Sequence, residues 1–244
     1  REIISLKNRN IKIIGSGDIF MERGIERLQE NDFIDAIALD FTNRDILNYL
    51  NGNYENIENM VFRRNGKFEF INLPRKNYYE FELPIPRHEL FLNKNYRMPF
   101  LKHKKFAPIL TDFGCPFKCS FCIMSTLGYK YRTIDNVIEE LNLLKKLNIR
   151  EIFFFDQTFG VRRERLIELC QEIINRKYNF GWVCFSRVDV LEEEIIMLMK
   201  ASGCHTIIFG IESGSDEILK KYKKGYTTEK IKETLRICSN LNIN

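Results

Sequence analysis

Three cysteines near the middle of the chain are the residues best suited to chemistry. Cys115, Cys119 and Cys122 follow the spacing Cys-x3-Cys-x2-Cys, and thiolates are soft ligands that select iron–sulfur clusters, zinc or copper(I). A structural zinc ion requires four ligands, whereas three thiolates on a four-iron cluster leave one iron open, as catalysis requires. The nearest further candidate ligand, His103, precedes the strand that leads into the loop. The spacing therefore predicts a cluster with an open iron, and zinc with an outside ligand is the alternative.

The elements that must position this loop form a repeating strand–helix pattern. Four apolar stretches are predicted to be strands, and the first leads into the cysteines: Pro108–Thr111, Glu151–Asp156, Gly181–Val188 and Cys204–Ile211. An amphipathic helix capped by Thr133 follows the loop, and further helices follow the other strands. This α/β pattern is typical of a βα barrel or a doubly wound parallel sheet, in which catalytic groups gather beyond the carboxyl ends of the strands. Four units do not close a barrel, so residues 106–244 are predicted to be the N-terminal part of one.

The first 105 residues divide into two parts. Residues 1–55 alternate strand and helix signals from a first strand at Ile11–Ile14, which is the pattern of a parallel sheet. Residues 56–105 contain a hairpin with Asn65-Gly66 at its turn, and four of the chain's six prolines follow, which predicts a linker between domains. The chain begins without Met and ends where a fifth strand is expected, so we expect a piece of a longer protein.

The composition excludes several classes of protein. Of 244 residues, 44% are hydrophobic and 29% are charged, which suits a packed core and not a disordered chain. No apolar run approaches the ~20 residues of a membrane span, and no signal peptide is recognisable. We therefore expect a cytoplasmic protein with reduced thiols. The net charge of +5 is mild, and the basic runs 102–105 and 220–224 are predicted to be solvated surface, with an anionic substrate or RNA as the alternative.

The segment from Cys115 to Cys122, Cys-Pro-Phe-Lys-Cys-Ser-Phe-Cys, resembles the signature of the radical S-adenosylmethionine (SAM) superfamily. The resemblance implies that Cys115, Cys119 and Cys122 hold a 4Fe–4S cluster and that SAM chelates the fourth iron through its amino and carboxylate groups. It also implies that the reduced cluster splits SAM into methionine and a 5′-deoxyadenosyl radical, which abstracts a hydrogen atom from the substrate. Phe121 matches the aromatic position beside the adenine, and ordinary core packing is the alternative.

Three other stretches resemble the same superfamily, so the resemblance covers about residues 106–244. The resemblance places Asp156, at the end of the second strand, against the SAM ammonium, which a carboxylate would bind in a charge-assisted contact. Ser186 and Arg187 end the third strand, and Arg187 could form a fork onto the SAM carboxylate. Glu212 ends the fourth strand, where the resemblance implies contact with the ribose hydroxyls or the ammonium. Local hydrogen bonding within the barrel is the alternative for all four side chains.

The front segment resembles the cobalamin-binding type of radical SAM protein. Residues 1–55 match the remnant of a Rossmann-like domain, in which Ile11–Gly17 would end a strand whose small residues let the cofactor approach the backbone. The glycine–glutamate pair that the type carries after the next strand is replaced by Leu39-Asp40-Phe41. The resemblance thus allows cobalamin in the full-length parent and puts its binding by this segment in doubt.

These observations predict a radical SAM enzyme of the cobalamin-binding type that catalyses methyl transfer to, or rearrangement of, an unactivated carbon. Its partners would be a small-molecule substrate and a reductant such as ferredoxin or flavodoxin. A radical SAM methylthiotransferase acting on RNA or protein is the alternative among enzymes, and a non-catalytic zinc-binding interaction module is the alternative of another class. The remaining cysteines are predicted to be buried filler: Cys170, Cys184, Cys204 and Cys238.

Overall fold

The structure is a computed structural model that describes residues 11–21, 23–72, 79–91, 96–124 and 128–244. The chain divides into two compact units, residues 1–75 and residues 76–244, and each is described by itself. None of the described helices is both long enough and apolar enough to cross a membrane.

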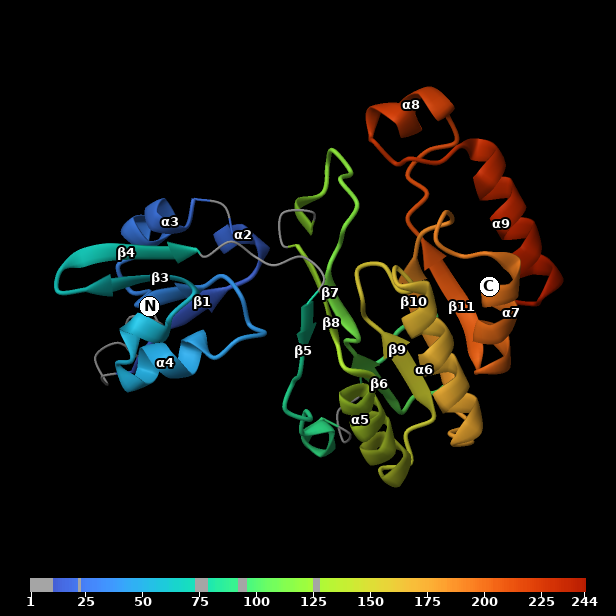
Figure 1. Cartoon of the computed structure of the whole chain (residues 1–244), viewed down its shortest axis with the longest axis horizontal. Helices are drawn as coiled ribbons and strands as arrows, with labels where there is room; N and C mark the ends of the chain where they lie inside the picture. Colours follow the sequence, from blue (N-terminus) through green and yellow to red (C-terminus); the bar gives the residue numbers. More distant parts are fainter. Residues whose placement is uncertain (1–10, 22, 73–78, 92–95, 125–127) are drawn as a thin grey trace. The chain divides into compact units, whose positions relative to one another are not determined.

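The first unit is a four-stranded sheet with helices on both faces (Figure 1). Its strands, in sheet order, are β1 (Ile14–Ser16), β2 (Ala36–Ala38), β3 (Asn59–Arg64) and β4 (Lys67–Asn72). Its helices are α2 (Asp18–Met21), α3 (Gly24–Glu30), α4 (Asp45–Asn51) and the short 3₁₀ helix η1 (Tyr54–Asn56). Strands β1 and β2 are parallel. One apolar cluster joins the sheet to α3 and a second joins it to α4, so the predicted α/β layering is present.

The predicted hairpin is present but does not belong to a linker. Asn65 and Gly66 take positive φ angles of 50° and 75° at the turn between β3 and β4. Strand β3 also pairs antiparallel with β2, and its residues Asn59–Phe62 are buried. Two short parallel strands leave their apolar faces uncovered, and the hairpin completes that sheet. The prediction of residues 56–105 as a linker was therefore wrong for this part.

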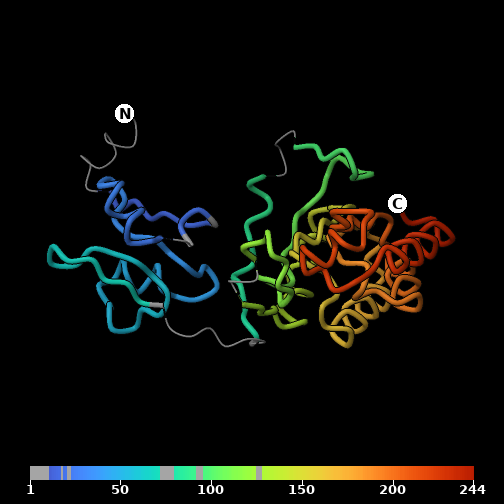
Figure 2. Tube along the Cα trace, turned by 90° about the horizontal axis from the view of Figure 1, so that it is seen from above, coloured from blue at the N-terminus to red at the C-terminus, as the bar shows by residue number. Residues whose placement is uncertain are grey.

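The second unit contains a parallel four-stranded sheet in the order β11-β10-β9-β6. Its strands are β6 (Phe106–Ile109), β9 (Glu151–Phe154), β10 (Gly181–Ser186) and β11 (Cys204–Phe209). The chain adds them in sequence order, as the colours running from green to red across this unit show (Figures 1 and 2). The sheet is open and not a closed barrel, so the predicted partial barrel of parallel strands is confirmed.

Four of the described helices of this unit pack on one face of the sheet and form its core: α5 (Ile134–Lys146), α6 (Arg163–Asn175), α7 (Glu193–Ala201) and α9 (Thr228–Asn240). The short helix α8 (Asp216–Lys221) lies beyond the end of β11 and buries Leu219 in a separate apolar cluster (Figure 1). The Thr133 side chain accepts a hydrogen bond from the Asn136 amide and caps α5 as predicted. Apolar residues of α5, α6, α7 and α9 meet alternate residues of the strands, including Trp182 and Phe154. The predicted filler cysteines at 170, 184, 204 and 238 are buried.

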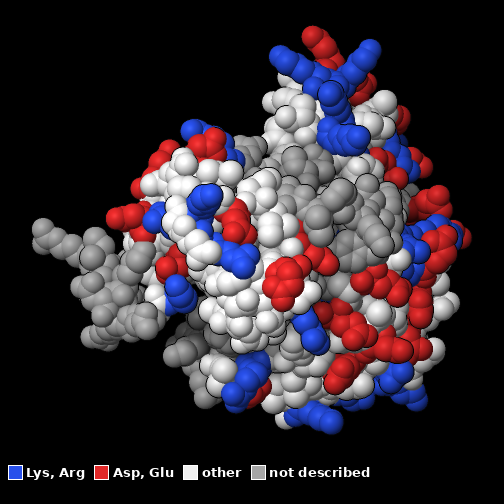
Figure 3. Space-filling model, turned by 60° about the vertical axis from the view of Figure 1, so that its left-hand side comes forward, with Lys and Arg blue, Asp and Glu red and all other residues white. Residues whose placement is uncertain are grey.

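Helix α8 was not predicted, because its sequence was taken for a solvated basic run. Lys220, Lys221 and Lys223 are indeed exposed, whereas Lys224 is buried. Basic side chains gather at the end of the molecule that carries α8 (Figure 3). The basic run therefore contains three lysines on the surface and one buried lysine, Lys224.

A smaller sheet supports the cysteine loop. Its strands are β5 (Tyr79–Phe81), β8 (Tyr129–Arg132) and β7 (Asp112–Gly114), in that order. Strand β5 falls in the predicted linker yet pairs parallel with β8. The short 3₁₀ helix η2 (His88–Leu90) follows, and His88 Nε2 lies 2.7 Å from Glu140 Oε1. The described part of segment 76–105 is therefore partly built into the second unit.

Candidate functional site

The cysteine loop begins at a narrow neck between β7 and β8. The Cys115 amide donates a hydrogen bond of 3.0 Å to the Gly128 carbonyl. Gly114 has a φ of 81°, and a Cβ there would lie 1.9 Å from the Gly128 carbonyl oxygen, closer than any side chain allows. Glycine at position 114 therefore lets the two backbones meet and fixes where Cys115 leaves the sheet.

The loop is also attached to a segment about 100 residues later in the chain. The Ser120 amide donates to the Tyr222 carbonyl at 3.1 Å, and its hydroxyl donates to the Lys221 carbonyl at 3.3 Å. The ring of Phe121 packs edge-on against Tyr222, with centroids 5.2 Å apart. Phe121 is nonetheless 54% exposed, so it is not a core residue and part of its ring remains accessible.

The three thiols differ from the other cysteines in exposure. Cys115, Cys119 and Cys122 are half-buried, whereas the four cysteines of the core are buried. Cys115 Sγ lies 3.5 Å from Thr158 Oγ1 at the end of β9. Burial raises the pKa of the Cys115 thiol, although the Thr158 hydroxyl opposes this rise. A thiol in this setting becomes a thiolate most readily when a metal binds it.

The donor set fits an iron–sulfur cluster. Three half-buried thiols come from one loop, and thiolates are the ligands of such clusters. In the described part of the chain, no three His, Cys, Asp or Glu side chains are gathered as one metal ion would require. A structural zinc ion holds four ligands around a single centre, whereas a four-iron cluster distributes its thiolates over separate irons.

Arg187, directly after β10, reaches the loop with its guanidinium. Its Nη1 lies 3.4 Å from Cys119 Sγ. Its Nε and Nη2 donate to the two Asp189 carboxylate oxygens at 2.9 and 2.8 Å, and Nη2 also donates to the Lys224 carbonyl. Four of the five N–H groups that an arginine carries are thus engaged. The predicted fork onto the SAM carboxylate would require Arg187 to give up these partners.

Lys224 is a buried cation next to the loop. It is 4% exposed, and its Nζ lies 3.5 Å from Glu212 Oε1. The same Nζ lies 5.8 Å from the Phe121 ring centroid and 5.4 Å from that of Tyr226. Glu212 has a φ of 67°, a conformation that is strained for a residue other than glycine and that collects at functional sites. Lys224, Glu212 and Phe121 therefore form one group at the end of β11.

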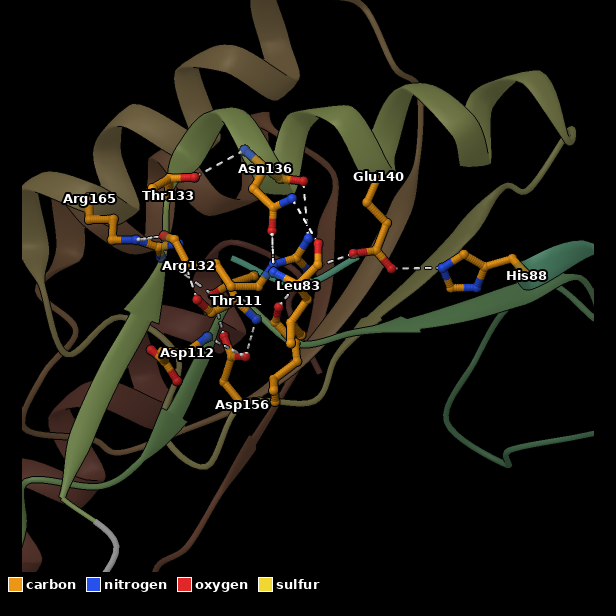
Figure 4. A network of polar contacts seen from close by, with 11 residues as sticks. Leu83, His88, Thr111, Asp112, Arg132, Thr133, Asn136, Glu140, Asp156 and Arg165 are labelled. Atoms are coloured by element: carbon orange, nitrogen blue, oxygen red, sulfur yellow. Dashed lines mark hydrogen bonds and ion pairs between the residues drawn. The ribbon is translucent and has the colours of Figure 1, made fainter. Parts of the chain in front are cut away.

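Asp156 has its hydrogen-bond partners within the protein, as the alternative interpretation expects. Its carboxylate is fully buried and accepts hydrogen bonds from the Thr111 amide and hydroxyl and from the Asp112 amide, at 2.6, 2.5 and 3.0 Å (Figure 4). Burial raises the pKa of Asp156, and these hydrogen bonds oppose that rise. The carboxylate therefore joins the segment after β9 to Thr111 and to Asp112 at the start of β7.

Ser186 is likewise engaged inside the protein. It is buried, and its hydroxyl donates to the Phe159 carbonyl at 2.8 Å. The structure thus brings together Cys119 with Arg187, and Phe121 and Glu212 each with Lys224, but leaves Asp156 and Ser186 in local contacts. The sequence interpretation did not identify Thr158, Asp189 and Lys224. For Lys224 the basic run concealed the signal, because charge alone does not show which lysine of a run turns inward.

The face of the four-stranded sheet away from the helices carries a cavity of about 670 Å³. Its lining is largely apolar and includes Met98, Pro108, Phe153 and Phe155. Phe153 and Phe155 also contact Phe185, with ring centroids 5.2 and 6.0 Å away. An apolar wall therefore lies on the four-stranded sheet, whereas the cysteine loop leaves the smaller sheet at β7.

A family model described as the radical SAM superfamily matches residues 110–244. The chain belongs to this superfamily. The match begins just before the cysteine loop and includes every residue predicted for the site. The recognition made from the cysteine signature is therefore confirmed, and the non-catalytic zinc module is set aside in favour of an enzyme superfamily.

Comparison with known proteins extends the similarity to the first unit. The chain is 31% identical over 233 residues to an uncharacterized methyltransferase, PH0819, of Pyrococcus horikoshii, covering 91% of this chain and 50% of that protein. The radical SAM methyltransferase TsrM of Kitasatospora setae, solved with tryptophan and a SAM analogue, has a TM-score of 0.76 at 18% identity over 99% of this chain and 50% of TsrM. The cobalamin-dependent radical SAM enzyme OxsB, solved with aqua-cobalamin, has a TM-score of 0.75 at 20% identity over 98% of this chain and 36% of OxsB.

The chain therefore spans about half the length of PH0819, the curated relative that matches 91% of it. The two structural similarities, at 20% identity or less, concern the fold. They cover both units, so the radical SAM fold class and the segment that precedes it are shared with cobalamin-dependent members of the superfamily.

Proposed function

We propose that the protein to which this chain belongs is a radical SAM methyltransferase that acts on an unactivated carbon of a small molecule. The observation that carries the proposal is the cysteine loop: three half-buried thiols on the loop between β7 and β8, one of them hydrogen-bonded to Arg187. The similarity to a methyltransferase over 91% of the chain supports the choice of reaction. Rearrangement at carbon is the other outcome of the same radical chemistry.

The roles of the three cysteines follow from their chemistry. Cys115, Cys119 and Cys122 would hold three irons of a 4Fe–4S cluster as thiolates. When bound, the reduced cluster supplies the electron that cleaves SAM to methionine and a 5′-deoxyadenosyl radical. The neck at Gly114 and the bonds from Ser120 to the later segment keep the three thiols in place.

We assign SAM binding to the group at the end of β11. Lys224, whose ammonium lies 3.5 Å from Glu212, offers a buried positive charge to the SAM carboxylate. The exposed ring of Phe121 offers an apolar face to the adenine. Glu212 is then free to accept hydrogen bonds from the ribose hydroxyls. Asp156 and Ser186 are assigned to support of the loop.

The remaining partners follow from the same proposal. An apolar small molecule suits the cavity beside Phe153 and Phe155, and a low-potential reductant such as ferredoxin or flavodoxin would supply the electron. We place the protein in the cytoplasm, where thiols stay reduced.

Cobalamin is proposed for the whole protein on its similarity to cobalamin-dependent enzymes. At the end of β1 a side chain added to Gly17 would meet nothing within 4 Å, so a ligand can approach that backbone. After β2, however, Leu39-Asp40-Phe41 replaces the glycine–glutamate pair of the family type, and Phe41 is 42% exposed. The described residues thus provide part of a cobalamin surface, and we derive no step through that cofactor.

A methylthiotransferase acting on RNA or protein remains the second candidate, because basic side chains are exposed at 102–105 and on α8. The relatives that carry methylthiotransferase or methylthio-adenosine synthase names match 55% and 72% of this chain, against 91% for the methyltransferase. The similarity therefore favours the methyltransferase.

Anaerobic reconstitution tests the proposal. We expect about four irons and four sulfides per chain, and 5′-deoxyadenosine or a methylated product when SAM and a reductant are added to the full-length protein. One equivalent of zinc with no turnover of SAM would contradict the proposal. Methylthiolated RNA as the product would select the second candidate.

A further inference from the structure

We propose that Arg187 is a positioning residue that holds the Cys119 thiolate through an N–H···S hydrogen bond and raises the reduction potential of the cluster, with Asp189 moderating the effect. The inference rests on the proposed function, because it presupposes a cluster on Cys119.

The geometry shows that this contact is not that of a loose surface arginine. Arg187 is 5% exposed, and its Nη1 lies 3.4 Å from Cys119 Sγ. The other side of the guanidinium is held by both oxygens of Asp189 and by the Lys224 carbonyl. Nη1 is thus presented to the sulfur by contacts that fix the rest of the group.

Two aromatic rings complete this setting. The guanidinium carbon lies 3.7 Å from the Phe117 ring centroid and 5.1 Å from that of Tyr226. Phe117 lies in the cysteine loop between Cys115 and Cys119. A planar cation stacked on an aromatic face has little freedom to rotate. Arg187 therefore contacts the loop twice, once through the Phe117 ring and once through the Cys119 sulfur.

The effect on potential follows from charge. When a low-potential donor gives one electron to the cluster, the negative charge on the cluster and its thiolates increases, while no bond forms or breaks and no proton moves. A cationic N–H donor stabilises the more negative state more strongly, so it raises the reduction potential. Hydrogen bonds to the sulfurs and the net charge nearby are known determinants of cluster potentials.

Asp189 makes the inference testable in both directions. Its carboxylate accepts from Arg187 at 2.9 and 2.8 Å, so it neutralises the guanidinium at short range. Removing the arginine should lower the potential of the cluster. Removing only the negative charge of Asp189 should raise it, because the cation beside Cys119 is then uncompensated.

The experiment is an anaerobic redox titration of the reconstituted holoprotein, followed by the electron paramagnetic resonance signal of the reduced cluster. We expect the midpoint potential to shift negative in Arg187→Met, to shift less in Arg187→Lys, and to shift positive in Asp189→Asn. Arg163→Met is the matched control, because Arg163 lies exposed at the start of α6 and pairs with Glu192 and Glu194 at the start of α7. Its potential should equal that of the wild type.

The outcomes separate this inference from the proposed function. A wild-type protein that binds no cluster overturns both. If the cluster has the same midpoint potential in the wild type, in Arg187→Met and in Asp189→Asn, the role of Arg187 is overturned and the proposed function stands. If Arg187→Met does not retain the cluster, Asp189→Asn decides: a positive shift supports the inference, and an unchanged or negative one overturns it.

Discussion

Two polar regions of the second unit each contain a buried arginine paired with a carboxylate, but the two arginines have different roles. In the network of Figure 4, Arg132 and Glu140 are each 1% exposed and form an ion pair of 2.6 Å. Arg132 also donates to the Leu110 carbonyl and to Asn136. Beside the cysteine loop, Arg187 instead directs an N–H at a half-buried thiol.

The difference lies in what each region leaves for a ligand. Arg132 and Glu140 satisfy their buried charges with protein partners, and Asn136 extends the network by exchanging hydrogen bonds with the backbone of Leu83. The region of the loop keeps three thiols half-buried and the Phe121 ring exposed. Buried charges whose partners all come from the protein indicate support, whereas polar groups that remain accessible indicate binding.

Cys119→Ala should have the largest effect, because it removes a ligand from the accessible region. We expect the iron and sulfide content after reconstitution to fall from about four of each per chain to a small fraction of that value, with the fold retained by circular dichroism. Cys170→Ala is the matched control, since Cys170 is buried in α6. A normal cluster in Cys119→Ala would contradict the assignment of the loop.

Glu140→Ala should affect stability instead of cofactor content. The change leaves Arg132 buried without its carboxylate and also removes the partner of His88. Loss of one partner of a buried ion pair lowers the free energy of unfolding by about 3–5 kcal/mol. Urea denaturation measures this loss, and Glu139→Ala, at an exposed position of the same helix, should be nearly neutral. Equal stability of the two variants would show that the network is not a support.

Lys224→Met should weaken the binding of SAM to the reconstituted protein. The variant keeps the length of the side chain and removes the buried ammonium beside Glu212 and Phe121. We expect the Kd for SAM to rise about 10-fold, which corresponds to about 1.4 kcal/mol, as measured by calorimetry. Lys220→Met, at an exposed position of α8, should bind SAM as the wild type does. An unchanged Kd in Lys224→Met would move the SAM carboxylate elsewhere.

Asp112→Asn should produce the smallest effect, visible as a pH dependence. Burial raises the pKa of Asp112 well above its ordinary range, and the nearby Asp156 charge raises it further. A raised pKa in the folded state favours the protonated acid, so wild-type stability should fall as the pH rises from about 4 through the folded-state pKa. The side chain introduced in Asp112→Asn cannot ionise, so the unfolding free energy of the variant should increase relative to that of the wild type as the pH rises over this range. Denaturation at several pH values, with exposed Asp135→Asn as the control, measures the difference.

The strands and helices of the second unit could be predicted from the sequence because their signals are local. The cap at Thr133 and the apolar runs of β9, β10 and β11 lie within a few residues of the elements that they define. The cysteine loop could be predicted for the same reason. Strand β5 could not, because its pairing with β8 joins residues about 50 positions apart.

The roles of single charged residues were harder to predict for the same physical reason. Asp156 ends a strand, as many SAM-binding residues do, but its carboxylate is occupied by Thr111 and Asp112. Lys224 belongs to a basic run, and only its burial distinguishes it from its neighbours. The role of a carboxylate or an ammonium depends on the groups around it in the folded protein, and these groups come from several helices and strands.

The two hydrogen bonds from Ser120 to the backbone of Lys221 and Tyr222 have a consequence for biosynthesis. The ligand-bearing loop emerges from the ribosome well before the carbonyls to which it is anchored. Until residues 221 and 222 have been translated and folded, the loop is held by the Cys115–Gly128 hydrogen bond and lacks the two bonds from Ser120. Delivery of iron and sulfide by the assembly machinery should therefore follow completion of this part of the chain, and nascent chains arrested before it should be poor acceptors.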